Sequence, residues 1–184
     1  MGKKIAIMVG SLSTKSINRR FAHALVKLAP ADVTFEFVEI GDLPLYNYDD
    51  DANQAESVKR VKAQINAADA VLLVTPEYNR SIPAALKNAV DHASRPYGDN
   101  TWNNKIGAII GTSPGGVGAA LAQNHLRQVL NAQGTILLQG PDAYLQFTDA
   151  LLTADGSVGE GSRAFLQSWL DKFLAFVDTN AAKA

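Results

Sequence analysis

The 184-residue sequence contains no cysteine. This absence excludes disulfide bonds, thiolate metal ligands and a cysteine nucleophile. The sequence also has no apolar run of the roughly 18 residues that a membrane-spanning helix needs, and the apolar segment Ile5–Gly10 is too short for the core of a signal peptide. We therefore expect a cytoplasmic protein that has no membrane partner.

An excess of charge of either sign is missing as well. The formal net charge is −1, and there is no block of basic residues. Proteins that bind nucleic acids usually carry such a block, so no nucleic-acid partner is expected. The composition, 47% hydrophobic and 19% charged, is that of a globular protein. The length predicts one domain over residues 1–184, large enough for a sheet with helices on both faces.

Strand-like and helix-like segments alternate five times along the chain. Apolar runs predict strands at Lys4–Val9, Val33–Ile40, Ala70–Thr75, Ile106–Gly111 and Thr135–Leu138. Apolar residues at helical spacing predict helices at about 17–29, 54–67, 83–94, 117–133 and 160–178. Five such units predict an α/β three-layer sandwich of the flavodoxin-like type. Its five-stranded parallel sheet would have the order 2-1-3-4-5, with helices on both faces.

The unusual chemistry lies in three loops that follow the first, third and fourth strands. These loops cover residues 10–18, 76–81 and 112–118. The three strands are central in the predicted order, and ligands of open parallel sheets bind beyond the carboxyl ends of the strands. We therefore expect the three loops to form one binding crevice.

The first loop reads Gly10-Ser11-Leu12-Ser13-Thr14-Lys15-Ser16-Ile17-Asn18 and opens the first helix. Its hydroxyls, its lysine and the N–H groups of a helix N-terminus favour the binding of one phosphate group. Alternatively, Ser16 is only a helix N-cap. The loop lacks the glycine spacing of a dinucleotide fingerprint and of a P-loop, so nucleotide hydrolysis is not expected.

The second loop, Thr75-Pro76-Glu77-Tyr78-Asn79, follows the most apolar strand. It offers backbone N–H groups, a carboxylate, a phenol and a carboxamide at the end of a buried strand. These groups suit a flat ring with polar edges. The alternative is an ordinary turn between a strand and a helix.

The third loop, Gly111-Thr112-Ser113-Pro114-Gly115, formally matches the G-x-S-x-G motif of hydrolases. The residue after such a serine must donate a backbone N–H to the oxyanion, and Pro114 has none. His125 is the last histidine and no acid separates it from Ser113, so hydrolysis is not expected. Glycines in this loop would let the backbone approach a ligand closely. They are Gly115, Gly116 and Gly118.

The remaining polar residues suggest no metal site. His23, His92 and His125 lie on separate predicted helices without a second ligand at metal-binding spacing, so surface or helix-end positions are expected for them. The acidic run Asp49–Asp51 is interpreted as a solvated loop.

Two segments favour self-association into a homodimer or homotetramer. The segment Leu43–Tyr48 carries two phenols, and either caps the protein's own core or lines a pocket at a dimer interface. The predicted helix 117–133 has few charges, and its face with Leu121, His125 and Gln128 suits a partner subunit, with core packing as the alternative.

Several of these motifs resemble the NADPH-dependent FMN reductase family, flavodoxin-like proteins that include bacterial quinone, chromate and azo-dye reductases. The resemblance covers essentially the whole chain. The most specific match is Pro76-Glu77-Tyr78-Asn79 with Ser81-Ile82-Pro83, followed by Leu86-Lys87-Asn88-Ala89. The other matches are Gly10-Ser11-Leu12 with Ser16 and Asn18, then Leu43-Pro44-Leu45-Tyr46, Asp91, and His125-Leu126-Arg127.

The resemblance implies bound FMN, with NADPH or NADH as cosubstrate. The first loop would hold the phosphate, the second would offer amides to the isoalloxazine edge, and the third would add further contacts. The cofactor-binding residues so implied are Ser11, Ser16, Ile17, Asn18, Pro76, Glu77, Tyr78, Asn79, Ser113, Gly115 and Gly116. The chain departs from the family at Ser13, where arginine is usual, and Lys15 or Arg19 is the candidate replacement for that cation. We therefore add Ser13 and Lys15 to the predicted site.

The chain has no redox-active side chain, so the cofactor must carry the electrons. The resemblance implies an oxidoreductase that passes hydride from reduced nicotinamide through FMN to a small-molecule acceptor. Quinones, azo dyes, metal oxyanions and free flavin are the candidate acceptors, and no catalytic side chain is required. The alternative is a non-enzymatic electron carrier of the flavodoxin type, but such carriers tend to be strongly acidic and this chain is not.

Overall fold

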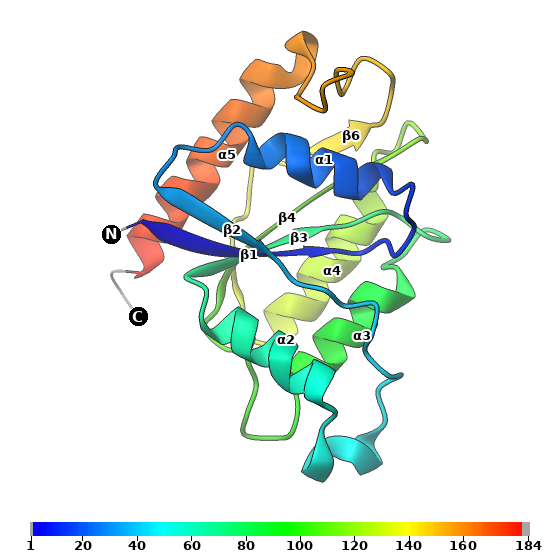
Figure 1. The fold of residues 1–184 in the computed structure, drawn as a ribbon, viewed down its shortest axis with the longest axis vertical. Coiled ribbons are helices and arrows are strands. Elements are labelled where there is room, and N and C mark those ends of the chain that lie inside the picture. The colour runs from blue at the N-terminus through cyan, green and yellow to red at the C-terminus, as the bar shows by residue number, and fades with distance from the viewer. Residues whose placement is uncertain (1, 182–184) are drawn as a thin grey trace.

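The computed structural model describes residues 2–181 and contains a parallel sheet between two layers of helices (Figure 1). The limits of the predicted domain, residues 1 and 184, therefore lie outside the described residues. The strands are β1 (Lys3–Val9), β2 (Val33–Phe37), β3 (Ala70–Val74), β4 (Ile106–Ser113), β5 (Ile136–Leu137) and β6 (Tyr144–Gln146). The order β2-β1-β3-β4-β5 confirms the flavodoxin-like prediction.

Helices cover both faces of the sheet. Figure 1 shows α1 and α5 on one side and α2, α3 and α4 on the other. Their bounds are Ile17–Val26 for α1, Glu56–Asn66 for α2, Ala84–Ala93 for α3, Ala120–Ala132 for α4 and Glu160–Ala181 for α5. None of these helices is both long and apolar enough to span a membrane, within residues 2–181.

The apolar strands form two cores because successive side chains point to opposite faces. Ile5 and Ile7 of β1 pack with α1 and α5, whereas Ala6 and Met8 pack with the helices on the other face. All of β3 is buried. This explains why the strand reads as a continuous apolar run.

The edge strand beside β4 differs from the prediction. Instead of one strand at 135–138, β5 pairs with Ile106 and Gly107, and β6 pairs with the end of β4 at Gly111–Ser113. Pro141 lies between the two short strands. Because proline has no N–H for the ladder, the edge is interrupted there.

Two further boundaries differ because of local backbone geometry. A 3₁₀ helix, η1 (Tyr48–Asn53), occupies the acidic segment that the sequence predicts as loop. Helix α4 begins at Ala120 rather than at 117, because Gly118 and Ala119 both have a φ of 62° and cannot continue an α-helix.

Candidate active site

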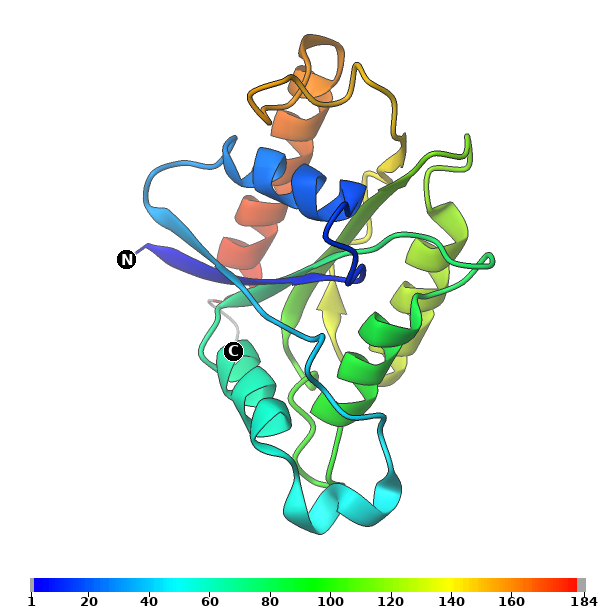
Figure 2. The ribbon, with the colours of Figure 1, turned by 45° about the vertical axis from the view of Figure 1, so that its right-hand side comes forward.

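The loops after β1, β3 and β4 lie at one end of the sheet (Figure 2). Together they line an open pocket of about 220 Å³. Its residues are Ser11, Ser13, Lys15, Ser16, Ile17, Asn18, Pro76, Glu77, Tyr78, Thr112, Ser113 and Pro114. The pocket contains every predicted site residue except Asn79, Gly115 and Gly116, which lie in the same loops. It also includes Thr112 and Pro114, which the sequence prediction placed in the third loop but not in the site.

The N-terminus of α1 forms an anion-binding cradle. Ser16 is the N-cap, and its Oγ accepts the N–H of Arg19 at 3.1 Å. The N–H groups of Ile17 and Asn18 have no hydrogen-bond partner among residues 2–181. A phosphate at this position would receive both N–H groups and the positive end of the helix dipole. Capping and anion binding are compatible here, since the Ser16 hydroxyl still has a proton to donate.

The side chain of Asn18 has a structural role. Its Nδ2 donates to the Thr112 carbonyl at 2.8 Å, and its Oδ1 accepts the Thr112 N–H at 3.0 Å. The carboxamide is buried and both of its ends are used in this way. The backbone N–H of Asn18 has no such partner among the described residues and remains for a phosphate. The side chain ties α1 to the end of β4.

Two cations lie near the position where the family has arginine. Arg19 is 3.8 Å from a carboxylate oxygen of Glu39. Lys15 is exposed and forms no ion pair within the part of the chain that the structure describes. Its backbone N–H donates to Ser13 Oγ at 3.2 Å, which places both residues on the rim of the pocket. Lys15 is thus the cation that is free to pair with a phosphate.

The second loop folds back as a two-residue hairpin, which we call the hairpin turn (Tyr78–Ser81). Tyr78 and Ser81 exchange backbone hydrogen bonds of 3.1 and 3.0 Å, and both Asn79 and Arg80 have positive φ angles, 49° and 63°. These angles are typical of a type I′ turn. The segment is therefore not an ordinary strand-to-helix turn.

The hairpin turn presents polar groups to the pocket. The N–H groups of Glu77 and Asn79 have no partner among the described residues, whereas that of Tyr78 is used within the turn. The Tyr78 hydroxyl lies 3.3 Å from Ser11 Oγ and so connects the second loop with the first. About half of the Tyr78 side chain is exposed. The turn thus has free amides and one exposed aromatic face.

The carboxylate of Glu77 forms its contacts within the protein, whereas the sequence suggests that it contacts a flat ring. Its Oε2 accepts the N–H groups of Leu121 and Ala122 at 2.9 and 3.3 Å, and its Oε1 pairs with Arg80 at 3.1 Å. Only 6% of the side chain is exposed. The carboxylate therefore binds the first turn of α4, and the backbone of Glu77 is what remains for a flat ring.

The glycines of the third loop have two different roles. We call Pro114–Gly118 the glycine loop. A Cβ on Gly116 would meet no atom within 4 Å, and one on Gly115 only Ser113 Oγ at 3.9 Å, so both positions are open to a ligand. Gly118 differs, since its Cβ would lie 2.4 Å from the carbonyl carbon of Tyr144. Packing against β6, rather than ligand approach, requires glycine there.

The geometry excludes a serine hydrolase. The Ser113 hydroxyl donates to the Gly115 carbonyl at 3.1 Å. His125 Nδ1 is instead hydrogen-bonded to Ser81 Oγ at 3.0 Å. A nucleophile without a hydrogen-bonded base has no means of activation. No group of three or more residues that could hold a metal ion occurs within residues 2–181.

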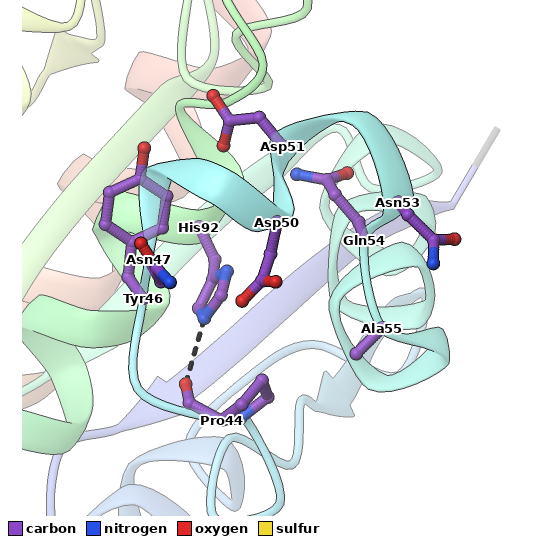
Figure 3. Close-up of a pocket in the computed structure, with 9 residues that line it drawn as sticks. All are labelled: Pro44, Tyr46, Asn47, Asp50, Asp51, Asn53, Gln54, Ala55 and His92. Carbon is purple, nitrogen blue, oxygen red and sulfur yellow. Dashed lines mark hydrogen bonds between the residues drawn. The ribbon is translucent and has the colours of Figure 1, made fainter.

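A second pocket, of about 200 Å³, lies beside η1 (Figure 3). His92 lies in its wall and is only 4% exposed. Of the two predicted positions, surface or helix end, the structure shows the helix end, because His92 is in the last turn of α3. Its Nε2 donates to the Pro44 carbonyl at 2.9 Å, and the ring of Tyr46 packs edge-on against it at 5.3 Å between centroids. Leu43 packs on the core, as the capping alternative for this segment predicts. Leu45 nevertheless stays 84% exposed.

The acidic residues make this second pocket unsuitable for a phosphate. Asp50 and Asp51 both line it. Asp51 pairs with Arg95 at 2.6 Å and is mostly buried, so the interpretation of the acidic run as a solvated loop is wrong at that residue. The Asp51 carboxylate raises the pKa of the Arg95 guanidinium, and burial raises the pKa of the Tyr46 phenol. The second pocket is therefore less suited to an anionic ligand than the first.

Comparison with known families identifies the family of the chain. The model of the NADPH-dependent FMN reductase family matches residues 3–149. The chain belongs to this family. As an FMN reductase it is an oxidoreductase that uses FMN, with NAD(P)H as the electron donor.

Relatives of this FMN reductase cover almost its whole length. A 2-hydroxy-1,4-benzoquinone reductase from Burkholderia is 49% identical over 178 residues, 96% of this chain and 97% of that protein. The structure of FerB, a flavoenzyme NAD(P)H:(acceptor) oxidoreductase from Paracoccus denitrificans, matches with a TM-score of 0.92 and 47% identity, covering 97% and 98% of the two chains. A flavodoxin variant from Pseudomonas aeruginosa matches with a TM-score of 0.60 at 20% identity, covering 95% of this chain and 99% of that chain, and shows the fold alone.

Proposed function

We propose that this FMN reductase transfers electrons from NAD(P)H to quinones, and that residues 1–184 form a single FMN-binding domain. The observation that supports the site most strongly is the convergence of the helix α1 cradle and the hairpin turn on one pocket. The names of the relatives support a quinone as the acceptor. The use of reduced nicotinamide, a metabolite of the cytoplasm, supports a cytoplasmic location.

The residues of the pocket divide into two groups under this proposal. The N–H groups of Ile17 and Asn18, the hydroxyls of Ser11, Ser13 and Ser16, and the ammonium group of Lys15 bind the phosphate. The N–H groups of Glu77 and Asn79 bind the ring edge, while Pro76, Tyr78, Ser113, Gly115 and Gly116 form the surrounding wall. When bound, FMN supplies the hydride-accepting and hydride-donating chemistry. No side chain of the pocket is required as an acid or base.

Reduced nicotinamide and the quinone should use the same ring face in turn. A flavin ring held against the hairpin turn and the glycine loop would have one open face, so the two substrates would exclude each other. Initial rates measured at varied NADPH and quinone concentrations should therefore give parallel double-reciprocal lines. Intersecting lines would show a ternary complex and would contradict the shared face. An electron carrier of the flavodoxin type would not oxidise NADPH at all in this assay.

We also propose that the protein forms a homodimer or homotetramer with the site near the subunit boundary. Three large apolar side chains, Leu45, Tyr48 and Tyr97, are strongly exposed. On α4, Leu121 is also partly exposed. Exposed apolar side chains of this kind are typical of protein interfaces.

Sedimentation velocity at micromolar protein concentration should show a dimer or tetramer. The double variant Leu45→Ser and Tyr48→Ser should shift the distribution towards monomer, because it removes exposed apolar contacts without touching either core. Tyr97→Ser, at the third of these exposed side chains, should shift the distribution in the same direction. A wild-type protein that sediments only as a monomer would refute the proposal.

A further inference from the structure

Helix α4 lacks a capping side chain of its own. Its N-cap position is Ala119, which has a left-handed backbone and no side chain that can accept a hydrogen bond. The first N–H groups of a helix need acceptors when water does not supply them. Here the Glu77 carboxylate, 44 residues earlier than Leu121, accepts the N–H groups of Leu121 and Ala122. Glu77, in the second loop, thus caps α4, the helix that follows the third loop.

A second contact joins the same two segments. Ser81, at the other end of the hairpin turn, is hydrogen-bonded to His125 one turn further along α4. The hairpin turn is therefore attached to α4 at two points. Motion of α4 relative to the turn would have to break the two charge-assisted hydrogen bonds of Glu77 and the Ser81–His125 hydrogen bond together.

The glycine loop depends on these attachments at its ends. A Cβ added to Gly115 or Gly116 would meet no atom closer than 3.9 Å, so packing at these two glycines does not fix the loop. One end of the loop continues from Thr112, which Asn18 holds through both backbone groups. The other end continues into α4, which Glu77 holds.

We propose that Glu77 is a positioning residue that fixes the glycine loop and α4 against the hairpin turn, and so sets the spacing between two walls of the FMN site. This inference rests on the proposed function in assigning those walls to FMN. The negative carboxylate also occupies the positive end of α4. The N-terminus of α1, which has no acidic residue in its first turn, remains available for the phosphate.

The first measurement uses the protein without FMN, so it does not depend on the proposed function. Hydrogen exchange at the amides of Leu121 and Ala122 should be at least about tenfold faster in Glu77→Ala than in wild type, since a charge-assisted acceptor is lost. Glu77→Gln should exchange within about threefold of wild type, because its amide oxygen can accept the same N–H groups. The matched control is Glu160→Ala, which removes an acidic residue from the first turn of α5, far from the pocket in sequence.

The second measurement is the dissociation constant of FMN by fluorescence titration. We expect Glu77→Ala to bind about tenfold more weakly, Glu77→Gln to recover most of that loss, and Glu160→Ala to match wild type. Unchanged exchange in Glu77→Ala would overturn the cap. Faster exchange in Glu77→Ala with wild-type FMN affinity would overturn the link to the cofactor site. A Glu77→Gln variant that binds FMN as weakly as Glu77→Ala would overturn that link too. A wild-type protein that does not bind FMN would instead refute the proposed function.

Discussion

Replacing Gly118 with alanine should destabilise the protein by about 3 kcal/mol or more, through backbone strain and steric overlap together. Gly118 has a φ of 62°, and its Cβ would lie 2.4 Å from the Tyr144 carbonyl carbon and 2.5 Å from the Leu145 nitrogen. Both atoms belong to the backbone of β6, which cannot yield as a flexible side chain would. Relief of the overlap would separate the start of α4 from β6.

Gly116→Ala is the matched control for this substitution, two residues earlier in the same loop. Its Cβ would meet nothing within 4 Å, and its φ is not positive. The free energy of unfolding should therefore change by no more than about 0.5 kcal/mol. Urea denaturation of the proteins without FMN measures both variants. Equal stability of the two variants would show that β6 does not constrain Gly118.

Asn18→Ala should reduce the free energy of unfolding by about 2–4 kcal/mol. The substitution leaves the N–H and C=O groups of Thr112 without their partner in a buried environment. It should also weaken FMN binding, because α1 and the end of β4 are no longer held together. The phosphate cradle and the glycine loop lie on the two sides of that contact.

Asn131→Ala provides the comparison for this prediction. Asn131 is exposed on α4 and makes no side-chain hydrogen bond with the residues that the structure describes. Its substitution should change stability by no more than about 0.5 kcal/mol. Thermal denaturation with and without FMN separates the effect on the fold from the effect on binding. If Asn18→Ala melted like Asn131→Ala, the buried pair with Thr112 would contribute no net stability.

The arrangement of the sheet could be predicted because its signal is local. β1 and β3 are short apolar runs, and their predicted bounds agree with the structure to within one residue. The strand order then follows from chain length and from the handedness of the crossovers. The convergence of the three loops is a consequence of that order.

The hydrogen-bond partners of the polar side chains could not be predicted in the same way. Glu77 binds a helix 44 residues away, Asn18 a strand 94 residues away, and His92 a carbonyl 48 residues away. Contacts over such distances leave no periodic pattern in the sequence. The position of Pro141 could have suggested the interrupted edge strand, since proline rarely lies within a strand that pairs along its length.

The interrupted edge beside β4 also bears on solubility. A long unpaired edge strand is a template on which a second chain can add by backbone hydrogen bonding, and this is a common route to aggregation. Here β5 offers only two residues and β6 only three, with Pro141 between them. No continuous row of donors and acceptors is available along this edge. Neighbouring copies in a crowded cell would therefore gain little from strand addition at this edge.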